Sequence, residues 1–212
     1  MLVLGDAHAV EPDRRRALRS AYDASDATTA LQLGDLMHYD LPVPTWFIAG
    51  NNEDLDVIEA LRAGDRPPAV ENANLLHSTT VDLEGVRFAG VSGNFAPTQY
   101  DKPRAHLHGD RRRHFVHEDV EAAKRLEDVD VLLSHEAPNG LLQYEHYDPG
   151  CDQVDDILDA LDPDLCLVGH HHEHLEMTYR DTRVVGLDAA WRSYYELDTT
   201  DLTLERFETP EA

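Results

Sequence analysis

The chain has 212 residues, enough for one domain with a sizeable core, and no shift of composition marks a second domain. Its 42 acidic residues against 18 basic ones give a formal net charge of -24. This balance argues against general binding to duplex nucleic acid, which requires a protein to neutralise phosphates. A hydrophobic content of 42% argues against an acidic disordered chain.

The charge also indicates the environment in which the chain works. Repulsion among the acidic groups lowers stability at low ionic strength, whereas concentrated salt screens it within a few ångströms. No stretch approaches the roughly 20 apolar residues of a membrane span, and no charged and apolar leader precedes the first apolar run. We therefore expect a cytoplasmic protein from a high-salt cytoplasm.

Apolar runs predict short buried strands, and helical periodicity predicts the helices between them. Loops are expected at 94–114 and 139–150, and Pro42 and Pro44 are expected in the loop before the third strand. The sum is two β-rich layers with helices outside, in one compact domain. In chain order, the predicted strands are 2–4, 30–33, 46–49, 75–82, 86–91, 129–133, 165–168, 174–179, 183–187, 193–197 and 202–207, and the predicted helices are 11–22, 54–62, 117–126 and 152–161.

Five of these strands end in a similar way, with ligand-type side chains directly after the apolar run and, in four of the five, a glycine between them. The last of them reads L-C-L-V-G-H-H-H and spans residues 165–172. A solvated turn explains one such histidine, but not five such strand ends. Open α/β sheets bind ligands at the carboxyl ends of their strands. The side chains delivered there are Asp6, His8, Asp35, Asn51, His135 and the triplet 170–172.

Carboxylates, amides and imidazoles together suit a first-row divalent metal better than calcium. The donors also outnumber what one tetrahedral ion needs. Two ions roughly 3.5 to 4 Å apart, bridged by a shared carboxylate, would use them all, activating a bridging hydroxide and neutralising phosphate oxygens.

The order of these motifs resembles the calcineurin-like metallophosphoesterase family, in particular its compact archaeal and bacterial phosphodiesterases. The motifs are D-x-H at Asp6, G-D at Asp35, G-N at Asn51, S-H-E-A-P at His135 and G-H-x-H at His170. The resemblance implies an α/β fold for residues 1–212, a single metallophosphoesterase domain built as a four-layer α-β-β-α sandwich of two mixed sheets with flanking helices.

The resemblance also implies a metal-dependent phosphoester hydrolase, a phosphodiesterase rather than a monoesterase, in which a metal-bridging hydroxide attacks phosphorus in line. The expected cofactors are two divalent ions, manganese first, with iron, zinc, cobalt and nickel as alternatives. His171 is expected to point elsewhere. One metal would be held by Asp6, His8, Asp35 and His172, and the other by Asp35, Asn51, His135 and His170, with Asp35 as the bridge.

One position departs from the family pattern, which usually has a histidine after G-N. Here it is Asn52, whose amide donates hydrogen bonds but transfers no proton near neutral pH. A general acid typically contributes ~100-fold to 10,000-fold, so that contribution comes from elsewhere or is absent. The catalytic candidates are Asn52 itself and His38, the nearest substitute along the chain. Other histidines in expected rim segments, which we interpret first as solvated surface, are His77, His108, His114 and His146.

Basic residues in the predicted 94–114 loop are candidates for holding substrate phosphates. They are Arg104 and the run Arg111, Arg112 and Arg113, in a chain with few positive charges. The competing interpretation is a solvated face. Residues 90–94 and the loop after them weakly resemble a substrate-side loop of lariat-debranching members of the family.

Two other functions compete with this interpretation. A scaffold that keeps the phosphoesterase fold to bind a protein partner would explain Asn52, but it has no need of seven ligands. A Rossmann-type nucleotide-binding regulator is disfavoured because no G-x-G-x-x-G follows the first strand. The expected partner is a phosphoester substrate, either a small molecule or a nucleotide or oligonucleotide, and a homo-oligomer is left open.

Overall fold

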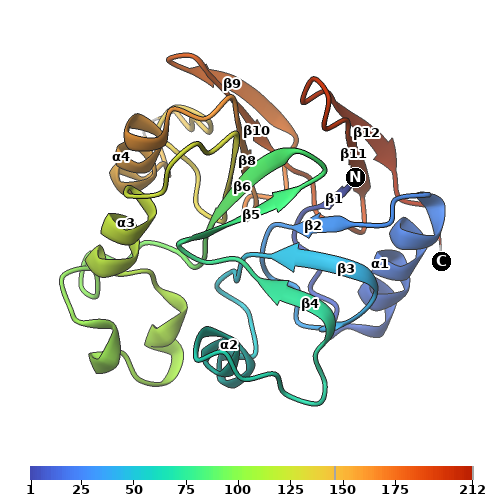
Figure 1. The fold of residues 1–212 in the computed structure, drawn as a ribbon, viewed down its shortest axis with the longest axis horizontal. Coiled ribbons are helices and arrows are strands. Elements are labelled where there is room, and N and C mark those ends of the chain that lie inside the picture. Colours follow the sequence, from blue (N-terminus) through green and yellow to red (C-terminus); the bar gives the residue numbers. More distant parts are fainter. Residues whose placement is uncertain (146, 212) are drawn as a thin grey trace.

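A computed structural model describes residues 1–145 and 147–211, so His146 lies outside the described residues. Figure 1 shows its helices and strands. The helices are α1 (Pro12–Ala24), α2 (Leu55–Arg62), α3 (His117–Ala123) and α4 (Asp152–Leu161), with 3-10 turns at Arg104–His106 and Gly109–Arg113. The strands are β1 (Leu2–Leu4), β2 (Ala30–Gln32), β3 (Asp40–Phe47), β4 (Glu71–Leu75), β5 (Thr79–Leu83), β6 (Val86–Val91), β7 (Val131–Ser134), β8 (Leu165–Val168), β9 (Leu175–Tyr179), β10 (Thr182–Gly186), β11 (Ser193–Leu197) and β12 (Leu204–Glu208).

The strands form two mixed six-stranded sheets, with the orders β12-β11-β1-β2-β3-β4 and β5-β6-β7-β8-β10-β9. In the first sheet β1 to β4 are parallel. At one edge β11 pairs antiparallel with β1, and β12 pairs antiparallel with β11. In the second sheet β6, β7, β8 and β10 are parallel, with β5 and β9 antiparallel at the edges. The parallel strands of each sheet therefore bring their carboxyl ends to a common edge.

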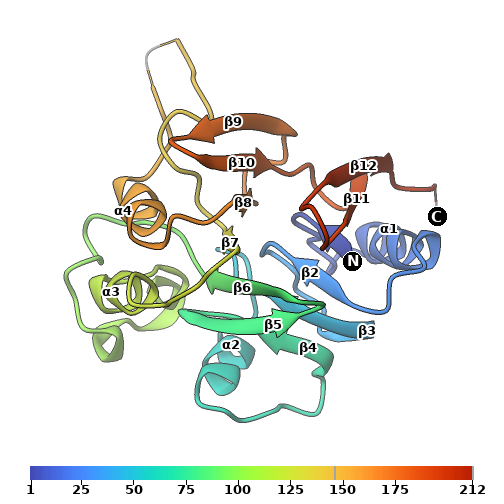
Figure 2. The ribbon, with the colours of Figure 1, turned by 45° about the horizontal axis from the view of Figure 1, so that its top comes forward.

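Three apolar clusters hold the layers together. The middle one lies between the two sheets and includes Leu31 and Leu33 of one and Leu133 and Leu167 of the other. A second joins α1 and α2 to the first sheet, and a third joins α3 and α4 to the second sheet. In Figure 2, α3 and α4 lie on one side of the molecule and α1 lies on the other, with strands between them. The predicted four-layer α-β-β-α sandwich is confirmed.

Local sequence explains where the main helices begin and end. α1 begins at Pro12, whose missing N–H costs nothing in the first turn, and it buries Leu18, Ala21 and Tyr22. α2 follows Asp54, whose carboxylate accepts hydrogen bonds from the first-turn amides. Among the described residues, no helix combines the length and the apolar character that crossing a bilayer demands.

Element ends differ from the prediction by up to three residues in places, as in α3, and two segments were misplaced outright. Pro42 and Pro44 belong to β3 and not to a loop before it, because the pairing of β3 with β4 is interrupted between Asp40 and Thr45 and a missing N–H is tolerated there. The predicted strand 75–82 is in fact the end of β4 and most of β5, which belong to different sheets. Asparagines at positions 72 and 74, poor strand formers, concealed the start of β4.

Candidate metal centre

Both sheets deliver polar side chains to one place. In the first sheet, Asp6 and His8 follow β1, and the ends of β2 and β3 lead to Asp35 and Asn51. In the second sheet, β7 leads to His135, and β8 leads to the histidine triplet. The structure brings five of the predicted ligands into two overlapping groups of three. Within each group, the potential ligand atoms lie within 4.8 Å of one another. One group is Asp6, His8 and His172, and the other is Asp6, Asp35 and His135.

Asp6 is the residue common to the two groups, and it is fully buried. Its Oδ1 atom lies 3.8 Å from His135 Nδ1 and 3.8 Å from His172 Nε2. Its Oδ2 atom accepts a hydrogen bond of 2.8 Å from the His170 backbone N–H. Within residues 1–145 and 147–211, however, Oδ1 has no hydrogen-bond partner. A buried carboxylate oxygen without a partner is costly, and a bound cation would remove that cost.

Asp35 contacts members of both groups. Its Oδ2 lies 3.4 Å from His8 Nε2, and its Oδ1 lies 3.8 Å from His135 Nε2. The remaining predicted ligands adjoin these atoms. Asn51 Oδ1 lies 3.1 Å from His135 Nε2, and the ring of His170 lies 4.9 Å from that of His135.

The imidazoles of the centre are held in the neutral form that binds metals. Burial lowers the pKa of His135 to about 4, and burial followed by the neighbouring His8 lowers the pKa of His172 to about 4. Burial also lowers the pKa values of His8 and His170. Burial and the nearby Asp35 raise the pKa of Asp6 well above its usual value, which is the expected behaviour of a carboxylate placed for a cation. A neutral imidazole keeps a lone pair for coordination.

The backbone at this edge is unusual. His8, Asp35, His170 and His172 all have left-handed conformations, with φ of 45°, 51°, 70° and 57°. Such conformations are uncommon outside glycine, and each costs of order 1 kcal/mol, so they persist where the surrounding structure imposes them. Their concentration among the predicted ligands marks a functional edge.

The glycine before Asn51 is required by close packing. A Cβ atom on Gly50 would lie 2.6 Å from His135 Cε1 and would also collide with Asp35. The glycine that precedes the ligands in the sequence pattern therefore lets one strand end approach the side chains of the next.

Asn52, at the position of the family's histidine, is bonded to Asp35. Its backbone N–H donates to Asp35 Oδ1 at 2.7 Å and its side-chain amide donates to Asp35 Oδ2 at 2.8 Å. Burial opposes ionisation of Asp35, but the adjacent His135 and these bonds outweigh it and keep the pKa of Asp35 below its usual value. Asn52 therefore orients Asp35 and, after His135, contributes to keeping it ionised.

Glu53 fastens the loop that carries Asp35. Its carboxylate accepts hydrogen bonds from the Leu36 N–H at 2.9 Å, the Met37 N–H at 3.1 Å and the Tyr39 hydroxyl at 2.6 Å. The segments after β2 and β3 are thereby tied to each other beside the centre. This acid could not be recognised as a support from sequence, because two of its partners are backbone groups.

His77, interpreted from sequence as a solvated rim residue, is largely buried and structural. Its Nε2 bonds Asp119 Oδ1 at 3.1 Å, and its Nδ1 accepts the Ser92 N–H at 3.1 Å. Ser92 Oγ in turn accepts the Ala49 N–H at 2.9 Å, directly before the glycine and asparagine that follow β3. Burial lowers the pKa of His77 to about 4. This chain of bonds supports the strand end that carries Asn51.

The other candidate histidines lie apart from the two ligand groups. His38 lines a small pocket with α1 residues and Pro42. His108 is exposed, and His114 Nδ1 contacts Asn94 O at 3.3 Å. The ring of His171 lies 4.9 Å from that of His170, and His171 belongs to neither of the groups identified within the described chain.

The four candidate arginines differ in how far they are engaged. Arg104 is ion-paired with Asp119, Arg112 pairs with Asp56 at 2.8 Å, and Arg113 pairs with Asp110 at 3.4 Å. Arg111 is exposed and pairs with no acidic group of the described chain.

Two residues that were not predicted from sequence stand beside the centre. The ring of Trp191 lies 5.1 Å from that of His172 and 5.7 Å from that of His8. The guanidinium of Arg14 lies over this tryptophan, 4.1 Å from the ring centroid. Only the scarcity of tryptophan, with two in the chain, could have drawn attention to position 191.

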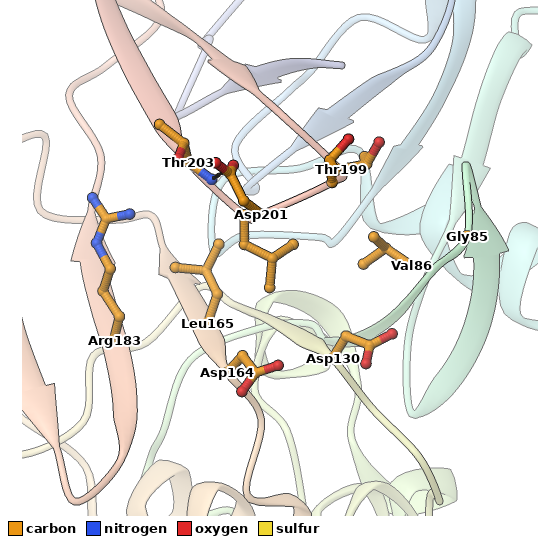
Figure 3. Close-up of a pocket in the computed structure, with 11 residues that line it drawn as sticks. Gly85, Val86, Asp130, Asp164, Leu165, Arg183, Thr199, Asp201 and Thr203 are labelled. Atoms are coloured by element: carbon orange, nitrogen blue, oxygen red, sulfur yellow. Dashed lines mark hydrogen bonds between the residues drawn. The ribbon is translucent and has the colours of Figure 1, made fainter.

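A cavity of about 530 Å³ lies at the opposite ends of the same strands. Figure 3 shows Asp130, Asp164, Asp201 and Arg183 around it, next to the beginnings of β6, β7, β8 and β10. Among the described residues, no buried side-chain atom without a hydrogen-bond partner belongs to its lining. The chemistry is therefore concentrated at the carboxyl ends.

Comparisons with known proteins agree with this geometry. The chain is 25% identical over 170 residues to the lariat debranching enzyme of Schizosaccharomyces pombe, covering 66% of this chain and 36% of that protein. The chain thus spans about a third of that relative's length.

Two solved structures share the whole fold. The protein TT1561 of Thermus thermophilus superposes with a TM-score of 0.70 at 19% identity, over 99% of this chain and 98% of that one. A structure described as a novel archaeal phosphodiesterase has a TM-score of 0.53 at 13% identity, over 98% of this chain and 99% of that one. A family model described as calcineurin-like phosphoesterase matches residues 1–174. The chain therefore belongs to the calcineurin-like phosphoesterase family, whose members are hydrolases of ester bonds.

Proposed function

We propose that the protein hydrolyses phosphodiesters with two divalent metal ions, manganese being the first candidate. The observation that carries the proposal is the buried Oδ1 of Asp6, which lacks a partner among the described residues although two imidazole nitrogens lie 3.8 Å away. The donor set fits such ions, because it combines two carboxylates, neutral imidazoles and an amide oxygen.

The proposed ligands are those expected from sequence. Asp6, His8, Asp35 and His172 would hold one ion, and Asp35, Asn51, His135 and His170 the other. The contacts of Asp35 with both His8 and His135 support its role as the bridge. Bound ions would lower the pKa of a water molecule and neutralise charge on the phosphoryl oxygens.

Asn52 would act by orientation and not by proton transfer. One N–H of its side-chain amide donates a hydrogen bond to Asp35, and the second N–H would be available to donate to an oxygen of the substrate. Because an amide cannot protonate a leaving group, turnover should depend steeply on how acidic that group is. His38 would remain without a part in the reaction unless the loop after Asp35 moves.

Substrate contacts outside the centre are proposed for the 94–114 loop. Arg111 is the best placed of its four arginines, because its charge is not committed to a neighbouring acid in the described chain. Roles for Arg104, Arg112 and Arg113 would require their ion pairs with Asp119, Asp56 and Asp110 to be shared with the substrate.

The test is hydrolysis of bis(p-nitrophenyl) phosphate and p-nitrophenyl phosphate with added manganese, in low and concentrated salt. We expect faster turnover of the diester. Asp35→Ala and His135→Ala should reduce activity to background and lower the manganese content after dialysis. His106→Ala, which changes an exposed histidine outside the ligand groups, serves as the control. Full activity in either ligand variant would contradict the proposal.

A scaffold without activity is the alternative, and Asn52 is the observation that favours it. A purified protein that retains no divalent metal and cleaves neither ester would support the scaffold. Stoichiometric metal together with diester turnover would exclude it.

A further inference from the structure

Positive charge is scarce in this chain, with 18 basic residues against 42 acidic ones, yet one arginine lies against the candidate metal centre. Arg14 is in the first turn of α1, and its Cζ atom lies 4.1 Å from the centroid of the Trp191 ring. Stacking on an aromatic face fixes the plane of a guanidinium group at little entropic cost.

Trp191 connects this arginine to two of the proposed metal ligands. Its ring lies 5.1 Å from that of His172 and 5.7 Å from that of His8, and these two histidine rings are 5.3 Å apart. The next residue, Arg192, donates from NH1 to the His172 carbonyl at 3.3 Å, which fixes the tryptophan's loop to the end of β8. The guanidinium of Arg14 is therefore one aromatic ring away from the centre.

The hydrogen-bonding capacity of Arg14 is mostly unused. Its Nε lies 3.1 Å from Glu11 Oε2, whereas its two terminal nitrogens donate no hydrogen bond in the described part of the chain. Its side chain is 32% exposed, so a ligand can reach it. A planar guanidinium with two free nitrogens matches the oxygens of a phosphate group.

We propose that Arg14, held over the ring of Trp191, binds a second phosphate group of the substrate, next to the phosphodiester at the metal centre. This inference rests on the proposed phosphodiesterase function and narrows its substrate class. An acidic protein repels a substrate that carries an additional negative charge, and a fixed cation beside the centre offsets that repulsion locally. The ion pair with Glu11 offsets part of the charge of Arg14 but leaves the hydrogen-bond donors of its terminal nitrogens available to a phosphate.

Two chromogenic substrates with the same scissile bond test this proposal. The p-nitrophenyl ester of thymidine 5′-monophosphate and its 3′-phosphorylated form differ only in the second phosphate. We expect the wild-type protein to prefer the 3′-phosphorylated substrate in kcat/KM, and Arg14→Gln to lose about 10-fold to 100-fold on that substrate alone, the range for a charge-assisted contact. Arg16→Gln is the matched control, because Arg16 lies on the same helix and is paired with Asp13 at 2.8 Å, also three residues away.

Binding supplies a readout that does not depend on turnover. A Trp46→Phe background leaves Trp191 as the sole tryptophan. Titration with thymidine 3′,5′-bisphosphate should change Trp191 fluorescence at a lower concentration than thymidine 5′-monophosphate, and Arg14→Gln should abolish that difference. Arg14→Lys should restore part of it, because a lysine keeps the charge but lacks the planar fork.

The outcomes separate this inference from the function on which it rests. Diester turnover with no effect of Arg14→Gln on the preference would overturn the role of Arg14 and leave the phosphodiesterase assignment intact. Arg14-dependent binding of the bisphosphate without turnover of any diester would support the anion site and reject the enzymatic function. An equal loss on both substrates would also reject the role, because it would show that Arg14 only stabilises the fold.

Discussion

Glu53 gives the sharpest test of how the centre is supported. Replacing it with alanine removes the acceptor of its three shortest hydrogen bonds, from the Leu36 and Met37 amides and the Tyr39 hydroxyl. A buried donor left without an acceptor costs about 1 to 3 kcal/mol. Because Glu53 is only partly buried, water satisfies part of the need. We take the lower value for each donor, which gives a loss of about 3 kcal/mol in the free energy of unfolding.

The same change should loosen the loop that carries Asp35. Groups that orient metal ligands typically contribute 10-fold to 100-fold in affinity, so manganese binding should weaken by about that factor. Urea unfolding measures the stability, and isothermal titration calorimetry measures the affinity. Tyr39→Phe removes only one of the three donors and should cost about 1 kcal/mol. Unchanged unfolding and unchanged manganese affinity in Glu53→Ala would refute the view that this carboxylate fastens the site.

Further predictions concern the pH dependence of stability, the packing at Gly50 and the effect of salt on the melting temperature. Burial lowers the pKa of His77 from 6.5 to about 4, so the unfolded chain takes up a proton first and stability is lost as pH falls through this window. His77→Gln should remove about 2 kcal/mol of that pH dependence, as measured by urea unfolding at pH 7 and pH 4.5. Gly50→Ala should abolish manganese binding in calorimetry because its Cβ would lie 2.6 Å from His135 Cε1. Gly64→Ala, which has open space around it but a φ of 84°, should lower stability and keep the affinity. The net charge of -24 predicts a melting temperature that rises with potassium chloride, and a melting temperature independent of salt would contradict this.

The sequence was most informative where one short pattern, an apolar run followed by a glycine and a potential metal ligand, indicates both a strand and its place at the site. A glycine after an apolar run lets neighbouring strand ends approach closely. The potential metal ligand that follows the glycine then lies at the edge that the strand ends share. This is why Asp35, Asn51 and His170 could be predicted from their neighbours alone to lie near that edge. α4 and β8 were predicted with the right boundaries for a similar reason, since their apolar periodicity is uninterrupted.

What could not be predicted depends on contacts between distant segments. Nothing local to Arg14 indicates that it stacks on Trp191, and nothing near His77 indicates that Asp119 will bury it. The crossing from β4 to β5 was hidden in a stretch that was predicted as one strand, 75–82, because a change of sheet leaves no mark in hydrophobic periodicity.

The division of donors between the sheets has a mechanical consequence. Asp6, His8, Asp35 and Asn51 follow strands of one sheet, whereas His135, His170 and His172 follow strands of the other. Neither sheet alone carries all seven proposed metal ligands. Bound cations would therefore link the two sheets at one end of the core. Metal binding would then slow amide hydrogen exchange in both sheets, most strongly next to the metal centre and least around the cavity at the opposite ends of the strands.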